Sequence, residues 1–217
     1  MARYDGGMDE ATTGTRAWLR EAARASVREQ VADRALTLFD ERGFDSVTVH
    51  QLADAIGISP RSFFRYFPSK EDVVIGDPEP FGEIVRSAAA QRPADESVWT
   101  VLRRSFDPIV ELTERPAYQA RGLRSIRVTM STASLRARNY EKHLSWAAML
   151  EPVILDRMEG VRDSRLFRAR ALILSALSCL DAALAEWTLC EGAVPLHTLL
   201  DDAFATVHSA HGRDGDA

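Results

Sequence analysis

The sequence predicts an all-α protein built from a three-helix N-terminal domain and a longer helical C-terminal domain. Two observations support this prediction. Apolar residues recur every three or four positions along most of the 217 residues, and no alternating strand pattern of useful length occurs. Helix-capping residues precede these apolar stripes, and glycine or proline follows them. At this length the chain can bury a substantial core.

The first helix of the N-terminal domain is predicted to end at Gly43. Its apolar stripe has the spacing i, i+4, i+8, i+11 and i+12, and it consists of Val27, Val31, Ala35, Leu38 and Phe39. Gly43 can adopt the left-handed conformation that closes a helix, and Phe44 follows it as a hydrophobic plug.

Residues 1–22 are expected to form a flexible arm, because residues 1–15 are rich in Gly, Thr and Asp and have little to bury. Arginines then repeat every fourth position, at Arg16, Arg20, Arg24 and Arg28. In a helix they form one basic edge. This edge is either simply solvated or an arm that touches phosphate or the minor groove of DNA.

Two short helices joined by a tight turn are predicted next. Thr48 and Gln51 have the spacing of a capping box, so a helix begins at residue 49, and Gly57 ends it. Ser59 is a good N-cap for the following helix, and Pro60 suits its first turn because the missing N–H would be unpaired there. Three helices within about fifty residues, the last two linked in this way, predict a helix-turn-helix domain.

The second of these short helices has two different faces. Phe63 and Phe67 lie four residues apart on one side and are expected to anchor the helix. The opposite side carries Arg61, Ser62, Arg65 and Tyr66, and residues 57–70 contain no acid. Such a face suits insertion into the major groove of DNA. A solvated basic face on an ordinary packed helix explains the same pattern.

The string ADRALTLFDERGFDSVTVHQLADAIGISPRSFFRYFPSK, residues 32–70, closely resembles the N-terminal domain of TetR-family transcriptional regulators. Five blocks arrive in the family order: ALxLFxERGF, T-V-xx-L-A, G-I-S, the aromatic-basic-aromatic-Phe block and P-S-K. The family usually has tyrosine where this chain has Phe64, so Arg65 or Tyr66 is expected to take over a phosphate contact. Arg61, Ser62 and Tyr66 are expected to read bases, and Thr48, Arg65 and Lys70 are expected to contact phosphate. The expected DNA-contacting residues are Thr48, Ser59, Arg61, Ser62, Arg65, Tyr66 and Lys70.

The remaining chain is predicted to be helical throughout. A brief helix over 71–75 is followed by a kink or loop at Asp77-Pro78-Glu79-Pro80, and the chain resumes near Phe81. Further helices are expected over 81–90, 97–113, 117–130, 134–158 with a bend at Pro152, 164–190 and 196–209. We therefore expect the arm at 1–22, the helix-turn-helix domain at 23–75, a ligand-binding and dimerisation domain at 76–209, and a disordered tail at 210–217.

The predicted helix 164–190 is apolar on nearly every side from Ala171 onward, so it must be covered on more than one face. Either it is the central helix of a monomer, or a two-fold partner covers it together with the helix 196–209. The family resemblance favours a homodimer, whose two recognition helices would read a palindrome. The expected interface residues are Leu172, Leu177, Leu180, Leu184, Trp187, Leu199 and Phe204.

Aromatic and soft side chains recur at helical spacing in the C-terminal half. They are either plain core or the wall of a pocket, and the family resemblance implies an effector cavity among these helices. The expected ligand-binding residues are Trp99, Phe106, Tyr118, Arg127, Met130, Tyr140 and Trp146. The stretch Leu135-Arg136-Ala137-Arg138, with FFRYFPSKED and the following GDP, also resembles actinobacterial members near the mycofactocin-system regulators. That resemblance implies an acyl-thioester ligand whose anionic head group arginines would bind.

Composition excludes several other classes. The net charge of −5 argues against a protein that coats nucleic acid nonspecifically, but allows a specific binder with one basic surface. Cys179 and Cys190 have no metal-ligand spacing and give no disulfide framework, so a reducing cytoplasm is expected. No signal peptide opens the chain, and the apolar run 171–180 is too short to cross a bilayer. The histidines are scattered, and the sequence contains no phosphate-binding loop and no nucleophile elbow. We therefore expect no catalytic residue, no metal site and no cofactor.

The sequence thus predicts a cytoplasmic, ligand-responsive DNA-binding regulator rather than an enzyme. A dimeric repressor, bound to a palindromic operator and released by a small hydrophobic or acyl-type effector, is the expected form, and activation is compatible with the same residues. A helical small-molecule-binding or scaffold protein, or a helical enzyme without sequence-specific DNA binding, is the alternative.

Overall fold

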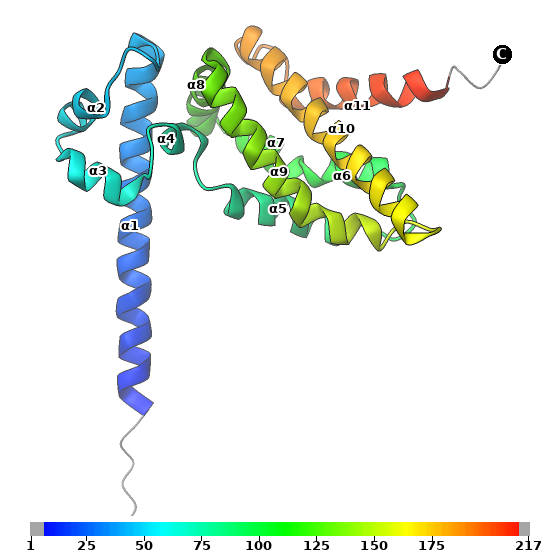
Figure 1. Ribbon diagram of the computed structural model, residues 1–217, viewed down its shortest axis with the longest axis horizontal. Coiled ribbons are helices and arrows are strands. Elements are labelled where there is room, and N and C mark those ends of the chain that lie inside the picture. The colour runs from blue at the N-terminus through cyan, green and yellow to red at the C-terminus, as the bar shows by residue number, and fades with distance from the viewer. Residues whose placement is uncertain (1–6, 213–217) are drawn as a thin grey trace, which may run out of the picture.

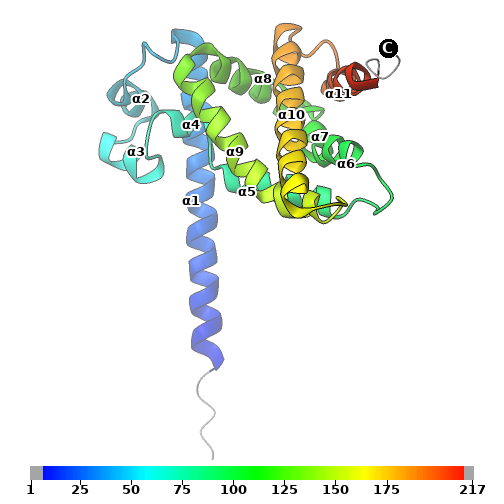
Figure 2. The same cartoon turned by 45° about the vertical axis from the view of Figure 1, so that its right-hand side comes forward.

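The computed structural model describes the backbone of residues 7–212 and the side chains of residues 24–116 and 118–209. Over this part of the chain it contains helices and no strand, which confirms the predicted all-α fold. Helices α1 to α4 form the N-terminal domain and α5 to α11 form the C-terminal domain, with α4 and α8 lying where the two meet (Figures 1 and 2).

The N-terminal domain has four helices: α1 (Gly7–Arg42), α2 (Val49–Ile56), α3 (Pro60–Tyr66) and α4 (Glu71–Ile75). The expected flexible arm at 1–22 is wrong for residues 7–22, because α1 extends through them without a break. Residues 8–42 contain no Pro and many good helix formers, and adding turns to an existing helix costs little once packing has nucleated it. Residues 1–6 lie outside the described part of the chain.

The caps of this domain follow the predicted chemistry. Thr48 and Gln51 form a complete capping box at the start of α2. The Ser59 hydroxyl accepts a hydrogen bond from the Ser62 N–H at 3.1 Å, with Pro60 in the first turn of α3. Gly57 has φ 83°, so this position needs a residue without a Cβ to turn the chain between α2 and α3. These caps and the turn at Gly57 fix the angle between α2 and α3.

Lys70 has a structural role that the sequence did not predict. Its ammonium donates hydrogen bonds to the carbonyl oxygens of Phe44 (2.8 Å) and Val47 (3.0 Å), and it lies 4.1 Å from the centre of the Phe44 ring. The connection between α1 and α2 is thereby tied to the start of α4. Two of the three ammonium donors are used inside the domain, so the structure does not favour the expected phosphate contact of Lys70.

The C-terminal domain has seven helices: α5 (Pro78–Ala90), α6 (Val98–Ser105), α7 (Asp107–Thr113), α8 (Pro116–Ser131), α9 (Ala133–Leu155), α10 (Arg162–Leu189) and α11 (Leu196–Gly212). The expected loop at 77–80 is wrong, because Asp77 caps α5 and Pro78 begins it. The single helix expected over 97–113 is divided near Phe106, where Pro108 lies in the first turn of α7. Residues 213–217 of the expected tail lie outside the described part, and α11 includes residues 210–212.

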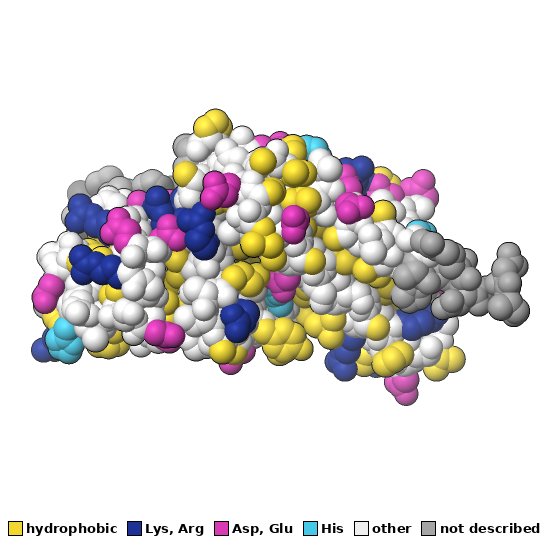
Figure 3. Space-filling model, turned by 90° about the horizontal axis from the view of Figure 1, so that it is seen from above, with side chains coloured by type: hydrophobic (Ala, Val, Ile, Leu, Met, Phe, Trp, Pro, Cys, Tyr) yellow, Lys and Arg dark blue, Asp and Glu magenta, His cyan; other side chains and the backbone are white. Residues whose placement is uncertain are grey.

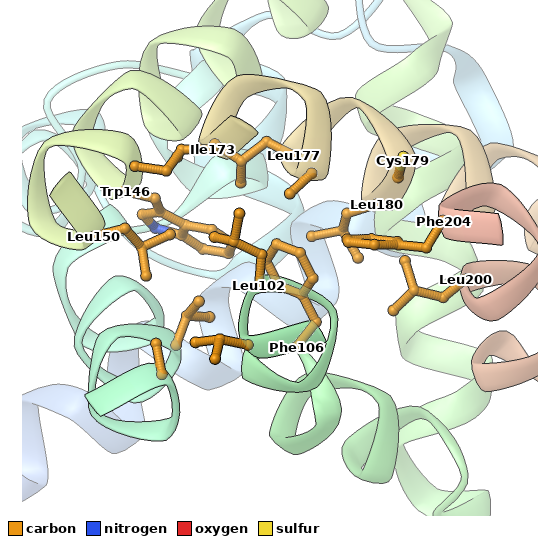
Figure 4. Close-up of a cluster of buried hydrophobic side chains, with 14 of the residues drawn as sticks. Leu102, Phe106, Trp146, Leu150, Ile173, Leu177, Cys179, Leu180, Leu200 and Phe204 are labelled. Atoms are coloured by element: carbon orange, nitrogen blue, oxygen red, sulfur yellow. The ribbon is translucent and has the colours of Figure 1, made fainter. Parts of the chain in front are cut away.

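Helix α10 is the centre of this domain. Figure 4 shows Ile173, Leu177 and Leu180 of α10 in one cluster with Leu102 of α6, Phe106 between α6 and α7, and Leu150 of α9. Phe204 of α11 lies in the same cluster. In length and composition α10 is the one helix of the described chain that could span a membrane. Its position in a folded core explains the same apolar composition.

Arg103 is the charged side chain that closes this core at the end of α6. It is only 7% exposed, and its guanidinium donates to Asp107 Oδ1 and to Asp201 Oδ1, both at 2.6 Å. A buried charge is tolerated when it is paired in this way. Arg103 therefore joins α6, α7 and α11.

The contacts of Lys70 generate a prediction about stability. Lys70→Met keeps most of the apolar stem but removes two charge-assisted hydrogen bonds. We expect the free energy of unfolding to fall by about 1–3 kcal/mol, as for other buried hydrogen bonds to charged groups. Urea unfolding followed by circular dichroism measures this change. Arg61→Ala is the matched control, because Arg61 is exposed and should alter stability by less than about 0.5 kcal/mol. A Lys70→Met protein as stable as the parent would contradict the structural role.

Candidate DNA-reading surface and ligand cavity

The exposed side of α3 carries the residues that were predicted to contact DNA. Arg61 is exposed at the start of the helix, and among the described residues it has no hydrogen-bonding or ion-pair partner. Arg65 Nη2 donates to the Tyr66 hydroxyl oxygen at 3.1 Å, and its guanidinium carbon lies 5.0 Å from the Tyr66 ring centre. These three side chains therefore share one face, with Arg61 free to reach outward.

The predicted serines and Thr48 are placed differently. The Ser59 and Ser62 hydroxyl oxygens are 3.0 Å apart, and the Ser59 oxygen also accepts the cap hydrogen bond of α3. Both hydroxyls therefore form hydrogen bonds within the first turn of α3. Thr48 is exposed and is held by Gln51 at the start of α2. The backbone N–H groups at a helix N-terminus can also bind a phosphate. Capping of α2 by Thr48 is therefore compatible with a phosphate contact at the same place.

The opposite side of α3 is buried, as predicted. Phe63 is fully buried and Phe67 nearly so, and their ring centres are 5.6 Å apart. Phe64 is 53% exposed and has no hydroxyl, which leaves an apolar ring at the place where the family usually has tyrosine. Buried aromatics on one face and free arginine on the other fix which face of α3 is presented outward.

Two arginines of the predicted basic edge support α3 rather than pointing freely to solvent. Arg24 Nη2 donates to the Arg65 carbonyl oxygen at 3.2 Å, and the Arg28 guanidinium lies 5.4 Å from the Phe67 ring centre. A positive charge at the C-terminal end of a helix also suits its dipole. The side chains of Arg16 and Arg20 lie outside the described ones.

A cavity of about 510 Å³ lies where the two domains meet. Its wall includes Ala32 and Leu36 of α1, residues 73–75 of α4 with the following residues 76 and 77, and residues of α5, α7, α8, α9 and α10. Most of the wall is apolar, and its polar groups lie mainly on α8 and α9, with Asp181 on α10. A cavity of this size can enclose a drug-sized organic molecule.

Three of the seven predicted ligand-binding residues line this cavity: Tyr118, Met130 and Trp146. The other four do not. Trp99 stacks on Phe204 and donates to its carbonyl oxygen, whereas Phe106 is fully buried in the core. Arg127 pairs with Asp40 at 3.1 Å, and Tyr140 points away from the cavity, with 57% exposure. Helical spacing alone does not separate the core side of a helix from the side that meets a cavity.

A polar group at the cavity, which was not predicted from the sequence, consists of Asn139, Lys142, His143 and Asp181. His143 Nδ1 lies 3.2 Å from Asp181 Oδ2, and Asn139 Nδ2 donates to Asp181 Oδ1 at 3.2 Å. Asn139, His143 and Trp146 are spaced i, i+4 and i+7, so a polar pair on an otherwise buried stripe of α9 is the signal that could have found them. Asn139 and His143 are both buried, at 8% and 3% exposure.

Lys142 differs from the other members of this group. It lies on the cavity wall with its ammonium 5.2 Å from the Trp146 ring centre. Among the described residues it has no hydrogen bond or ion pair. Burial lowers the pKa of Lys142 to about 8, against a smaller opposing effect of Asp181.

The predicted dimer-interface residues are mostly core residues of the same chain. Leu177, Leu180, Trp187 and Phe204 are at most 4% exposed in a single copy, so the assignment of these residues to an interface is wrong. Leu172 and Leu199 pack partly against the same core, and Leu184 lines the cavity. The apolar side of α10 that one copy leaves open is a different stripe, with Phe167 (74% exposed), Leu174, Ala182 and Leu189 (78% exposed).

The charges are distributed unevenly over the molecule. Seen from above (Figure 3), basic and acidic side chains lie next to one another over the end that carries α1 to α4, and hydrophobic side chains spread across the middle of this face.

Within the described residues no cluster of three or more potential metal ligands is present.

Comparison with known proteins agrees with this architecture. A family model described as bacterial regulatory proteins, tetR family, matches residues 31–75. HTH-type transcriptional regulator TcmR of Streptomyces glaucescens is 34% identical over 92 residues, which is 42% of this chain and 41% of TcmR. The chain thus matches less than half of that relative's length.

A second relative is similar over most of its length. The putative mycofactocin biosynthesis transcriptional regulator MftR of Mycobacterium tuberculosis is 24% identical over 184 residues, covering 85% of this chain and 90% of MftR. These relatives are transcriptional regulators and not enzymes.

Solved structures share the fold. FadR of Bacillus subtilis, in complex with stearoyl-CoA, has a TM-score of 0.53 and 18% identity, covering 82% of this chain and 95% of FadR. FadR of Bacillus halodurans has a TM-score of 0.56 and 18% identity, covering 82% and 92%. The N-terminal domain therefore matches the tetR family of bacterial regulatory proteins over residues 31–75, and the overall fold is similar to that of the two FadR structures.

Proposed function

We propose that this transcriptional regulator binds a two-fold symmetric operator as a homodimer and is released from it when an apolar or acyl-type effector enters the cavity. One observation carries the proposal: the cavity is walled by both domains. Val73 and Val74 of α4 are buried in the N-terminal core and also line the cavity. An effector that reshapes this wall changes the position of the domain that carries α3.

The DNA-reading element in this proposal is α3. Arg61 is exposed and has no partner among the described side chains, so its guanidinium can form the paired hydrogen bonds that arginine makes with guanine in the major groove. Arg65 and Tyr66 flank it and Thr48 caps α2, which suits contacts to the sugar-phosphate backbone. Phe63 and Phe67 hold the helix in place from behind.

The proposed dimer uses the outer stripe of α10. Phe167, Leu174 and Leu189 are exposed and recur at helical spacing, with Ser178 and Ala182 exposed between them. Small residues allow a second α10 to approach closely, and exposed apolar side chains of this size usually mark an interface. Two copies joined there present two α3 helices, which is what reading a palindrome requires.

The proposed effector is apolar over most of its length. The cavity wall is largely aliphatic and aromatic, and the FadR structure with a similar fold contains stearoyl-CoA. A cytoplasmic metabolite with an acyl chain fits both observations. Repression follows if operator binding blocks transcription, and the relative KstR2 of Rhodococcus jostii, 42% identical over 53 residues, is a transcriptional repressor.

The proposed signal passes through ion pairs that cross between the domains. Arg138 of α9 donates to Asp72 of α4 at 2.9 Å, and Arg121 of α8 donates to Glu29 of α1 at 2.7 Å. Burial alone would raise the pKa of the Asp72 carboxyl, but hydrogen bonds from Ser69 and Arg138 hold it below its usual value. The Asp72 carboxylate therefore stays charged and keeps α4 attached to α9. We expect effector-linked changes of ordinary allosteric size, about 1–3 kcal/mol.

DNA reading by Arg61 is tested first. Arg61→Ala should weaken binding to the preferred operator by about 1–3 kcal/mol and relax the preference for one base pair, because the contact is to a base edge. In vitro selection of a binding site, followed by fluorescence anisotropy with each single-base variant, measures both effects. Arg162→Ala, which removes an exposed arginine at the start of α10, is the control and should leave the affinity unchanged. Equal losses on every sequence would reassign Arg61 to phosphate.

The dimer surface is tested by a charge in its centre. Leu174→Glu should convert the dimer into a monomer, because it places a carboxylate in an apolar contact. Sedimentation equilibrium measures the mass, and circular dichroism checks that the helices remain. Ala137→Glu, on the exposed side of α9, is the control. A Leu174→Glu protein that stays dimeric would mean that another surface joins the copies.

The coupling route is tested at Arg138. Arg138→Ala frees α4 from α9, so we expect unchanged operator affinity without effector and a release by effector that is several-fold smaller. Operator titrations with dodecanoate and with its CoA thioester give this ratio. Arg136→Ala is the control, because Arg136 donates to the Met130 carbonyl and does not contact α4. A full effector response in Arg138→Ala would exclude this ion pair from the route.

A further inference from the structure

The chain uses lysine at only two positions, Lys70 and Lys142, although Lys and Arg together number 27. Neither lysine is an ordinary surface charge. Lys70 is bonded to two carbonyl oxygens of its own domain, whereas Lys142 lies on the wall of the cavity. Lysine offers a compact charge with freely rotating donors, unlike the planar guanidinium of arginine. Lys142 is thus the sole amine side chain that a cavity ligand can meet.

The other charged groups on the cavity wall already have partners. Arg121 pairs with Glu29 at 2.7 Å, and Asp181 is held by His143 and Asn139, each at 3.2 Å. The Asp77 carboxylate accepts a hydrogen bond from the Glu79 N–H at 3.0 Å as the cap of α5. Lys142 alone among these described residues has a charge without a hydrogen-bonding or ion-pair partner.

An unpaired ammonium next to an apolar cavity is costly unless an anion joins it. We propose that Lys142 is the anchor for the carboxylate of a monoanionic amphipathic ligand, such as a medium- or long-chain fatty acid, whose apolar body fills the cavity. This proposal rests on the proposed function in that it names the effector class of the same cavity. It deepens that function because it selects the free acid over a coenzyme A ester.

The selection follows from the charges that the cavity offers. A carboxylate needs one ammonium and a few hydrogen bonds, which Lys142 supplies and His143 can supplement from one residue away on α9. Coenzyme A carries several phosphate groups, and the second cation of the wall, Arg121, is committed to Glu29 and lies 3.7 Å from Asp33. A cavity of about 510 Å³ encloses an acyl chain but offers these phosphates no further free cation among its described residues.

The ammonium also makes binding dependent on pH. Burial lowers the pKa of Lys142 to about 8. The other titratable groups on the same cavity wall are its neighbour His143 on α9, Asp181 on α10, and Glu29, Asp77, Tyr118 and Arg121. A bound carboxylate favours the charged amine and raises its pKa. Binding is therefore strongest below pH 8, where the free protein already carries the proton. Above pH 8 the complex must take up a proton, and the affinity falls by up to about tenfold per pH unit.

Isothermal titration calorimetry of the full-length protein, without DNA, tests the proposal. The probes are octanoate, dodecanoate and hexadecanoate, each compared with the alcohol of the same chain length and with its CoA thioester. We expect at least one acid to bind at pH 7 more tightly than its alcohol by roughly 10-fold or more, as for other hydrogen bonds to a charged partner. Lys142→Met should remove this preference, and Lys142→Arg should retain most of it.

The two lysines permit a direct measurement on the amine itself. Reductive methylation with ¹³C-formaldehyde labels Lys70, Lys142 and the N-terminus, and the Lys70→Arg variant leaves Lys142 as the only labelled side chain. Its NMR signal should titrate near pH 8 in the free protein and at a higher pH in the complex with the acid. Thermal melts of Lys142→Met check folding, and removal of a partly buried amine is expected to leave the melting temperature unchanged or raised.

The possible results separate this proposal from the proposed function. Acids that bind no better than their alcohols, acids that bind Lys142→Met as well as the parent, or no binding by any of the three acids would each overturn the Lys142 anchor. CoA thioesters that bind more tightly than the acids would also overturn it, while leaving effector-controlled DNA release intact. Failure to bind any operator in the selection experiment would instead overturn the proposed function without touching the calorimetric result.

Discussion

The short helix α4 belongs to two structures at once. Val73 and Val74 are buried in a core that α1, α2 and α3 share with Val128 of α8 and Leu135 of α9, and the same two residues form part of the cavity wall. Because interiors are closely packed, the wall cannot change shape without moving side chains of the N-terminal core. Asp72 is tied to Arg138 of α9, and α8 is tied to α1 by Arg121, so the two domains meet through these contacts. The position of α3 relative to the C-terminal domain therefore depends on α4.

Three sets of charges bear on how the domains meet and on which anions the molecule can bind. Arginines of α8 face the acidic residues of α1 and join the domains, as Arg121 does with Glu29 and Arg127 with Asp40. Arg61 faces outward from α3 with no partner in the described chain. The amine of Lys142 faces the cavity. The net charge is −5, so positive charge does not dominate the surface as a whole. This distribution suits a protein that recognises specific anions and does not coat nucleic acid.

Helix α10 shows why an all-round apolar pattern has more than one solution. The sequence pattern requires that other helices pack on several faces of α10. Large residues such as Leu177 and Trp187 were expected to contact a second copy of the chain. In the structure these large residues fill the core of their own domain, and smaller or isolated apolar residues such as Ala182 and Leu174 remain outside. Large apolar side chains fill the core because the free energy of folding gained by burial increases with the apolar area that is buried. The outer stripe is consequently less apolar than the sequence pattern suggests.

The sequence by itself determined the local structure: the capping box at Thr48, the glycine turn at Gly57, the two-faced α3 and the helical nature of the whole chain. These features depend on residues a few positions apart, whose chemistry can be read directly. Only the tertiary structure decided that Lys70 binds carbonyls of the α1–α2 connection, and that Trp99 and Phe106 are core rather than cavity. It also brought Lys142 of α9 and Asp181 of α10, which lie almost forty positions apart in the sequence, to one cavity. Such contacts depend on how helices cross, and helical periodicity fixes the direction of a side chain from its own axis but not the neighbour that it meets.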